Sequence, residues 1–364
     1  MKIAIVAPLV SAIREPQRGG SQAFVADLAR GLLDRGHEVH LYAASGSDVS
    51  GVPVIDTGVD SRALAATLYR ASSPAADSAA VADAAFATVY ATVGETRYDV
   101  VHNHAFDAPA IRLATGLPAP VVHTLHLPPD TAVADALRDA VRSHRAPVVA
   151  AVSAWQASAW RRVVSVDAIL SPFVPTRAIR WLASAGEGAV FAGRLSPEKG
   201  AVEAIEIARA AGVRIDLYGD IYDAEYTRER IDPRRADPGV AVHPGVPRTV
   251  IWETIARAAV VLCPAMWEEP FGMVAAEAQA CGTPVVAFRR GALDEVILDG
   301  VTGFLVAPDD IAAAARAVRK TAELSRSRCR DHAERHLDLE LSLDAHEQLY
   351  GRAARAGVRA AASG

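Results

Sequence analysis

The chain has 364 residues, of which 51% are hydrophobic and 22% are charged. Two domains are expected, because a single hydrophobic core usually stops growing at about 250–300 residues. The formal net charge of −5 gives no support to nucleic-acid binding as the main task. The cysteines, Cys263, Cys281 and Cys329, form no C-x-x-C pair, and their odd number argues against a disulfide framework. A reducing, cytoplasmic setting is therefore expected.

Short β-branched runs alternate with alanine-rich helical stretches in the first half. The opening run, KIAIVAP (2–8), contains Pro8 and is too short for a secretory signal, so it is predicted to be a buried strand. A helix is expected from about Ser21 to Arg35, and residues 60–96 are expected to be helical in two pieces. Further strands are predicted at 37–43, 99–104, 120–126 and 147–153.

The same alternation begins again after residues 171–181, which contain two prolines and are interpreted as a linker. Residues 186–200 predict a strand, a loop and a helix start, and a last helix is expected over 339–357. Further strands are predicted at 213–220, 259–265, 283–288 and 303–308. This alternation predicts an α/β fold with mostly parallel sheets, in two units of roughly 170 residues. No apolar run reaches about 18 residues, so no membrane span is expected.

Residues directly after strands are the informative ones, because ligands bind beyond the carboxyl ends of strands in open α/β sheets. Gly19 and Gly20 follow the first strand, and Ser21 is a candidate N-cap for the next helix. A glycine pair lets backbone approach a ligand, and a helix N-terminus favours an anion or a sugar hydroxyl. The pattern is not G-x-G-x-x-G, so no dinucleotide site is indicated, and a capped turn explains the pair equally well.

A second candidate follows the strand that opens the second unit. Gly193 turns the chain there, and Arg194 and Lys199 flank a Ser-Pro-Glu turn, so both cations can reach the same side of the loop. Arginine with its planar fork and lysine with its point charge are a common pairing around a diphosphate. A solvated surface pair is the competing interpretation, and the position after a strand favours phosphate.

Two carboxylates eight residues apart, Glu269 and Glu277, form the third candidate. Glu277 interrupts an apolar, alanine-rich helix predicted to begin near residue 271 or 272, and it lies about five residues, or roughly 7.5 Å along the axis, into that helix, whereas Glu269 lies before it. Amides of Phe271, Gly272 and Met273 lie between the two carboxylates at the helix N-terminus.

Carboxylates accept hydrogen bonds from vicinal hydroxyls, and helix-end amides suit phosphate. The layout therefore matches the sugar, diphosphate and ribose of a sugar nucleotide. The competing interpretation places Glu277 on an exposed helix face, and Glu268 is expected to face solvent.

Four histidines lie at predicted strand ends: His102, His104, His123 and His126. Alternate strand positions face the same side, so His102 and His104 are expected to lie together. His104 and His126 come last in their strands and are the better site candidates, although a structural role is the simpler explanation for each. The sequence fixes no further ligands and contains no D-x-D pattern, so no metal site is predicted.

At this order and spacing the segments resemble the retaining family 4 glycosyltransferases, whose GT-B fold has two Rossmann-like domains facing each other across a cleft. EPFGMVAAEAQACGTPVVAF resembles the E-x7-E segment of the family, and GRLSPEKG resembles its diphosphate-binding loop. RGGSQAFVADLARGLLDRGHEV resembles its first strand, loop and helix, and GALDEVILDGVTGFLV resembles its later stretch. The resemblance spans nearly the whole chain.

The resemblance implies roles on the donor side of the reaction. Glu269 would hold donor-sugar hydroxyls beside the reacting carbon, and Glu277 would bind the ribose. The amides of Phe271, Gly272 and Met273 would meet sugar and phosphate.

Arg194 and Lys199, with Gly193 beside them, would stabilise the leaving diphosphate, so neither a metal nor another cofactor is implied. His126 would contact the donor sugar from the N-terminal domain, with His104 nearby.

The resemblance also implies a division of the chain. Residues 1–171 would form an acceptor-binding domain, with Gly19 and Gly20 on the cleft floor. Residues 172–339 would form the donor-binding domain, and a helix at about 340–364 would return to the first domain. DIYDAEYTRERIDPRRADPGVAVHPG (220–245) replaces the family's short glycine-rich turn near the nucleobase.

The implied activity is transfer of a sugar from a nucleotide diphosphate sugar, a UDP-sugar rather than a GDP-sugar, to an acceptor hydroxyl with retained configuration. Two alternatives stay open: an epimerase or hydrolase of the same fold, and a catalytically silent sugar-nucleotide-binding subunit. The expected partners are the donor and a hydroxyl acceptor, without nucleic acid, and peripheral membrane contact stays open. The sequence names neither the sugar nor the acceptor.

Overall fold

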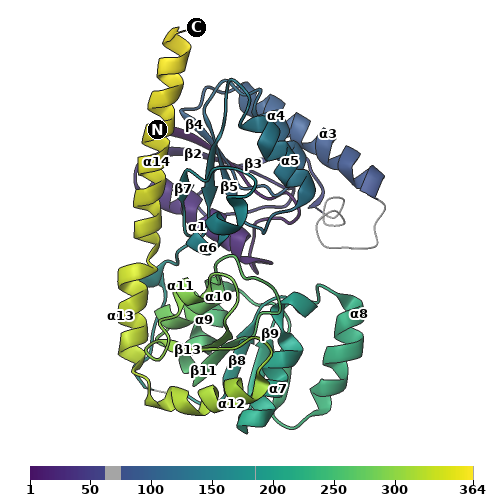
Figure 1. The fold of residues 1–364 in the computed structure, drawn as a ribbon, viewed down its shortest axis with the longest axis vertical. Coiled ribbons are helices and arrows are strands. Elements are labelled where there is room, and N and C mark those ends of the chain that lie inside the picture. Colours follow the sequence, from purple (N-terminus) through teal and green to yellow (C-terminus); the bar gives the residue numbers. More distant parts are fainter. Residues whose placement is uncertain (62–74, 185, 364) are drawn as a thin grey trace. The chain divides into compact units, whose positions relative to one another are not determined.

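The computed structural model describes residues 1–61, 75–184 and 186–363 (Figure 1). The chain divides into two compact units. Unit 1 comprises Met1–Arg14, Ser21–Ser171 and Ser342–Gly364, and unit 2 comprises Glu15–Gly20 and Pro172–Leu341. Each unit contains one parallel β-sheet between helices, so the predicted α/β fold with two successive units is confirmed.

The sheet of unit 1 has the strand order β3-β2-β1-β4-β5-β6-β7, and all neighbouring strands are parallel. Its strands are β1 (Lys2–Val6), β2 (Glu38–Ala43), β3 (Val54–Asp56), β4 (Val100–Asn103), β5 (Val121–Leu125), β6 (Val148–Ala151) and β7 (Ala168–Ile169). Every position of β4 and β5 is buried, as is typical of parallel strands covered on both faces.

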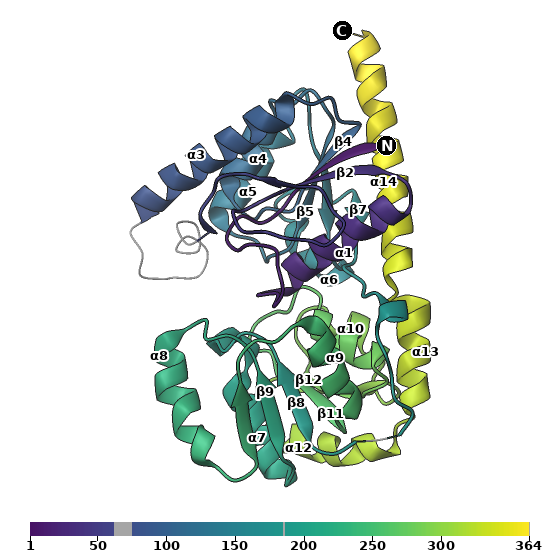
Figure 2. The same cartoon turned by 180° about the vertical axis from the view of Figure 1, so that it is seen from behind.

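The helices of unit 1 cover both faces of this sheet (Figures 1 and 2). They are α1 (Gly20–Asp34), α3 (Ala75–Gly94), α4 (Ala108–Ala114), α5 (Thr131–Ala140), α6 (Ala154–Trp160) and, from residue 342 on, α14 (Leu339–Ser363). On one face, Phe86 and Tyr90 of α3 pack in a cluster with Tyr42 of β2. On the other, Tyr350 of α14 bonds to His102 of β4, and an ion pair of 2.9 Å joins Arg35 to Glu347.

The sheet of unit 2 has the order β10-β9-β8-β11-β12-β13, again parallel throughout. Its strands are β8 (Ala189–Ala192), β9 (Ile215–Tyr218), β10 (Val240–His243), β11 (Val260–Cys263), β12 (Val285–Phe288) and β13 (Gly303–Val306). Its α-helices are α7 (Ala201–Ala211), α8 (Ala224–Tyr226), α9 (Arg248–Arg257), α10 (Met273–Ala280), α11 (Leu293–Val296), α12 (Ile311–Lys320) and α13 (Arg326–His336). Shorter turns of helix are η1 (Thr176–Ala178), η2 (Pro197–Lys199), η3 (Thr227–Ile231), η4 (Asp232–Ala236) and η5 (Thr321–Glu323).

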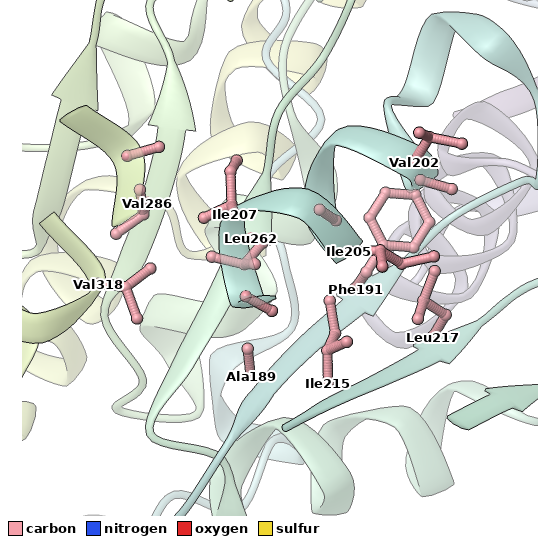
Figure 3. Close-up of a cluster of buried hydrophobic side chains, with 14 of the residues drawn as sticks. Ala189, Phe191, Val202, Ile205, Ile207, Ile215, Leu217, Leu262, Val286 and Val318 are labelled. Atoms are coloured by element: carbon pink, nitrogen blue, oxygen red, sulfur yellow. The ribbon is translucent and has the colours of Figure 1, made fainter. Parts of the chain in front are cut away.

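The core of unit 2 lies between this sheet and the helices α7 and α12 (Figure 3). Val202 and Ile205 of α7 lie near Phe191 of β8 and Leu217 of β9. Their spacing along α7 places them on one face of the helix, and full burial of each such side chain contributes about 1.5–3 kcal/mol. This packing fixes β8 and the start of α7, and therefore the loop between them.

Several expectations need correction. Short or polar strands were not predicted: β3, β7 and β10. Residues 220–245, for which no structure was predicted, contain α8, η3, η4 and β10. Residues 171–181, interpreted as a linker, are bonded to the body of unit 2. Val174 forms a β-bridge with Asp338, and the guanidinium of Arg330 donates to the carbonyls of Thr176 and Ile179. Of the predicted pair of helices at 60–96, α3 is seen and residues 62–74 lie outside the described residues.

The last helix, α14, continues to Ser363, beyond the end of the stretch 339–357 that was expected to be helical and close to the end of the helix at about 340–364 that the resemblance implies. Among the described ranges, no helix has both the length and the apolar character that a bilayer crossing needs.

Candidate functional site

The candidate residues gather where the strand order of each sheet reverses. This point lies between β1 and β4 in unit 1 and between β8 and β11 in unit 2. Ligand sites of open α/β sheets lie at the carboxyl ends of the strands at such a point, because the chain leaves the two central strands in opposite directions. Gly19 and Gly20 follow β1 and His104 follows β4, whereas Arg194 follows β8 and Glu269 follows β11.

Lys199 and Glu269 form an ion pair in unit 2, which sequence reasoning did not anticipate. Lys199 Nζ lies 2.8 Å from Glu269 Oε2, and Trp267 Nε1–H donates to the same oxygen at 2.8 Å. The ammonium also lies 4.8 Å from the centre of the Trp267 ring. The two charged side chains are only 23% and 15% exposed, so the surface-pair interpretation of Lys199 does not hold.

Arg194 lies on the same loop as Lys199, and its side chain contacts Glu198 and Tyr222. Its Nη2 lies 3.2 Å from Glu198 Oε1, which also accepts a hydrogen bond from Ser196. Its guanidinium lies 4.8 Å from the centre of the Tyr222 ring. Gly193 begins the loop, and its N–H donates to the carbonyl of Tyr218 in β9. The loop therefore presents a fixed cation directly after β8.

The segment before α10 depends on a glycine. Gly272 has φ 99° and is the N-cap of α10, and a Cβ there would lie 2.6 Å from Leu293 Cδ2. A larger residue would therefore be strained by the backbone conformation and would have to displace the side chain of Leu293. Phe271 is buried, with its ring centre 5.9 Å from that of Phe173. The amides of Met273 and Val274, the first two of α10, precede the first hydrogen bond of the helix, which Ala275 N–H donates to the carbonyl of Gly272. These two amides can receive an anion.

Glu277 is buried and paired with an arginine. It is 6% exposed, and its Oε1 accepts from Arg248 Nε at 3.1 Å and from Arg248 Nη2 at 2.9 Å. The guanidinium lies 4.8 Å from the centre of the Trp252 ring. The exposed-face interpretation is therefore wrong, and the view of Glu277 as held only by ribose is incomplete. Sequence reasoning missed Arg248, because one arginine at the start of a helix carries no distinctive signal.

Glu268 is exposed as predicted, but it also has a structural contact. Its Oε2 accepts a hydrogen bond of 2.6 Å from the N–H of Gly291. Gly291 has φ 61°, and a Cβ there would lie 2.1 Å from the carbonyl oxygen of Glu269. The N–H of Ala292 donates to that same carbonyl at 2.8 Å. The loop at 290–292 therefore fixes the backbone of Glu269.

The histidines of unit 1 form a buried cluster. His104 Nδ1 lies 2.9 Å from His126 Nε2, and the ring centres of His102 and His104 are 3.9 Å apart. His102 bonds to Tyr350 and Thr124, so its contacts are structural. Burial lowers the pKa of His126 to about 3 and holds the pKa of His104 well below its ordinary value. These rings are therefore neutral at pH 7.

In the parts of the chain that the structure covers, no three His, Cys, Asp or Glu side chains are placed to hold a metal ion. Metal independence stays a prediction, because catalysis with a metal bound by the substrate is not tested by that observation.

Comparisons with known families cover both units. The family described as "Glycosyltransferase Family 4" matches residues 18–176, and the family described as "Glycosyl transferases group 1" matches residues 184–336. A curated protein of Acidothermus cellulolyticus, D-inositol 3-phosphate glycosyltransferase, is 30% identical, and the match covers 87% of this chain and 82% of the relative.

Solved structures share the fold over the whole chain. Sucrose-phosphate synthase of Thermosynechococcus elongatus has a TM-score of 0.79 at 20% identity, covering 98% of this chain and 100% of that one. The Anabaena Alr3699/HepE protein in complex with UDP-glucose has a TM-score of 0.73 at 21% identity, covering 96% and 100%. The two-unit fold is thus that of the GT-B glycosyltransferases, and the chain belongs to glycosyltransferase family 4.

Proposed function

We propose that this glycosyltransferase transfers a sugar from a nucleotide diphosphate sugar to an acceptor hydroxyl with retained configuration. The observation that carries the proposal is the Lys199–Glu269 pair at the carboxyl ends of β8 and β11, with Arg194 on the same loop as Lys199. A cation beside a carboxylate suits the junction between a diphosphate and a sugar. The Anabaena protein of the same fold, solved with UDP-glucose, supports a UDP-sugar.

The donor would bind on unit 2. Lys199 and Arg194 would neutralise the diphosphate, and the amides at residues 271–273 would contact phosphate and sugar. Glu269 would accept hydrogen bonds from sugar hydroxyls. Glu277, oriented by Arg248, would bind the ribose.

Unit 1 would bind the acceptor and contribute to the donor sugar. His126, oriented by its hydrogen bond to His104, is placed directly after β5 and would contact a sugar hydroxyl as a neutral ring. Gly19 and Gly20, which follow β1 along the chain but belong to unit 2, would let backbone approach the ligands.

The proposed step needs no enzyme nucleophile. The bond between the anomeric carbon and the phosphate oxygen breaks, and both electrons pass to the diphosphate. The acceptor oxygen attacks from the same face, and its proton passes to the leaving phosphate oxygen. Preorganised cations at the departing oxygen supply much of the rate enhancement, because they stabilise the charge that develops in the transition state. Retention is carried over from the family resemblance.

The test is a panel of UDP- and GDP-sugars assayed with and without alcohol acceptors, in the presence of excess EDTA. The proposal predicts a glycoside that forms only with acceptor and with the chelator present. Free sugar or an epimerised donor formed without acceptor would instead identify a hydrolase or epimerase. Donor binding without turnover across the panel would identify a silent binding subunit. Loss of activity in EDTA with recovery in magnesium would overturn the metal-independent mechanism.

A further inference from the structure

A cavity of about 370 Å³ lies within unit 1, between the carboxyl ends of β4 and β5 and the helices α3, α4 and α5. Its walls are largely apolar and include Phe106, Ile111, Leu125, Leu127, Val133 and Trp160. His126, the proposed sugar contact, also lines it. The size and apolar walls are typical of a small-molecule site, and such a site needs a few convergent polar groups.

His123 supplies a buried donor to this cavity. The ring is 1% exposed, and its Nε2 has no hydrogen-bond partner among the described residues. The side-chain oxygen of Asn103 accepts from the N–H of Ala105, so its amide nitrogen faces His123 Nδ1 at 2.8 Å and donates to it. The proton of the neutral ring is therefore on Nε2. Burial lowers the pKa of His123 to about 3, which keeps the ring neutral.

Asp107 supplies a buried acceptor. It is 8% exposed, and its Oδ2 has no partner within the described ranges. It occupies the N-cap position of α4, where an aspartate ordinarily accepts a hydrogen bond from a helix amide, but here its side chain makes no capping bond. Burial raises the pKa of Asp107 to about 6, so the carboxylate form still dominates at pH 7. A buried carboxylate oxygen without a hydrogen-bond partner is costly, which points to a ligand that completes it.

The charges around the cavity disfavour an anion. Three lining residues are acidic, Asp83, Asp107 and Asp130. Arg112 is the one lysine or arginine among the described lining residues, and its guanidinium is paired with Asp83. A phosphate placed here would face carboxylates without an available cation.

We infer that this cavity binds the acceptor, and that the acceptor is an uncharged alcohol with an apolar body. Before transfer, its hydroxyl accepts a hydrogen bond from His123 Nε2–H and donates one to the Asp107 carboxylate, which satisfies both buried groups. In the transfer step this O–H turns from Asp107 to the leaving phosphate oxygen, which takes the proton. The inference rests on the proposed transferase function. It differs from what the name of the Acidothermus relative suggests, since D-inositol 3-phosphate is an anionic polyol.

The test is calorimetric titration of the full chain, without donor, with four probes. 2-Naphthalenemethanol has the proposed apolar body and hydroxyl, 2-methylnaphthalene lacks the hydroxyl, and 2-naphthoate and D-inositol 3-phosphate are anions. We expect the alcohol to bind most tightly. Tighter binding of either anion, or equal binding of 2-methylnaphthalene, would overturn the inference.

Asp107→Ala separates a ligand contact from a structural role. We expect binding of the alcohol to weaken about tenfold to a hundredfold, the effect of one charge-assisted hydrogen bond, with no loss of thermal stability because no capping bond is removed. Asp139→Ala, an exposed carboxylate on α5, is the matched control. Unchanged alcohol binding in Asp107→Ala contradicts the inference. His123→Phe, melted in parallel, should weaken binding through the other hydrogen bond.

Transfer assays then test whether the bound alcohol is the acceptor. The expected product is a naphthylmethyl glycoside, and Asp107→Ala should raise the KM for the alcohol while leaving the KM for donor unchanged. If the alcohol binds but the protein glycosylates only anionic acceptors, the acceptor assignment is wrong and the transferase function stands. If no sugar is transferred to any acceptor while the alcohol still binds, the proposed function fails and the cavity remains an alcohol site.

Discussion

Two glutamates of one segment have different partners, and their substitution should affect different kinetic parameters. Glu269 bonds to Lys199 and Trp267 and lies beside the proposed reacting carbon. Glu277, in α10, bonds instead to Arg248 of α9. Only interactions that are stronger in the transition state than in the ground state raise turnover. The two carboxylates can therefore be separated by steady-state kinetics.

Glu269→Gln should lower kcat by about a hundredfold or more, because a charged group that faces the developing positive charge is worth roughly 3–4 kcal/mol in such sites. Steady-state kinetics with saturating donor checks this. Glu268→Gln is the matched control: its amide oxygen can still accept from Gly291, and its kcat should stay within about threefold of the wild type. Equal losses in the two variants would show that the loop, not the carboxylate of Glu269, matters.

Glu277→Gln should mainly raise the donor KM, because contacts to the ribose are similar in the ground and transition states. The variant should also lose roughly 1–3 kcal/mol of unfolding free energy, since the guanidinium of Arg248 loses a partly buried charged partner. Kinetics and a denaturant titration measure the two effects. An unchanged KM together with a lower stability would make the carboxylate purely structural.

At the level of residues, sequence reasoning could identify single candidates but not their pairs. Lys199 and Glu269 were each selected from their positions after strands, yet their contact joins residues 70 positions apart. Arg248 and Trp267 carried no pattern of their own, because their roles follow from packing between elements. The solvent-facing interpretation of Glu268 missed its bond to Gly291, since glycine in a loop does not reveal which carboxylate its amide meets.

At the level of elements, the loop that fixes Glu269 can be tested through its glycine. Gly291→Ala should lower kcat at least about tenfold, because the added Cβ must displace the backbone of Glu269. Gly300→Ala is the matched control, since Gly300 has φ 75° and nothing within 4 Å of the added carbon. It should cost only about 1–2 kcal/mol of stability through backbone strain. Similar kcat values for the two variants would contradict the claim that the loop at 290–292 fixes the backbone of Glu269.

The strands β4 and β5 and the helix α14 bring five buried histidines into unit 1, and these should make the protein acid-labile. The pKa of each lies below its ordinary value because burial disfavours the charged ring: His102, His104, His123, His126 and His346. The unfolded chain therefore takes up protons first as pH falls below about 6.5. The unfolding free energy should fall from pH 7 to pH 5, by up to about 1.4 kcal/mol per pH unit for each histidine.

Denaturant titrations between pH 5 and 8 measure this slope. His346→Gln should reduce the slope of unfolding free energy against pH by the contribution of one histidine. Substitution of the exposed His144 by Gln should leave the slope unchanged. Asp107 acts in the opposite direction, because its raised pKa of about 6 means that stability is lost as pH rises from about 4 to 6. An unfolding free energy that is flat or rises on acidification would contradict the buried, neutral state of the cluster.

Elements were predictable where the pattern was long. The buried runs of β1, β4, β5, β11 and β12 were found within one or two residues, because apolar β-branched residues dominate them. β7 has two residues and β3 has three, which is too short for any periodicity. β10 was missed because it follows a charged helical segment and is only half-buried.

For the whole molecule, the order of strands and helices was enough to predict two parallel α/β units, because parallel strands require helical crossovers. The cavity in unit 1 could not be predicted, since its walls come from four helices and two strands separated along the chain. That Asp107 Oδ2 and His123 Nε2 have no partner among the described residues is a property of the packed structure. No sequence pattern distinguishes them from an ordinary N-cap and an ordinary core histidine.

The most direct test of the central claim is the anomeric configuration of the product. The wild-type protein is incubated with the UDP-sugar that reacts in the panel and with its acceptor, and the product is followed by proton NMR from the first turnover. The account predicts a glycoside with the same anomeric configuration as the donor. A glycoside of inverted configuration, or free sugar and UDP without glycoside, would contradict it.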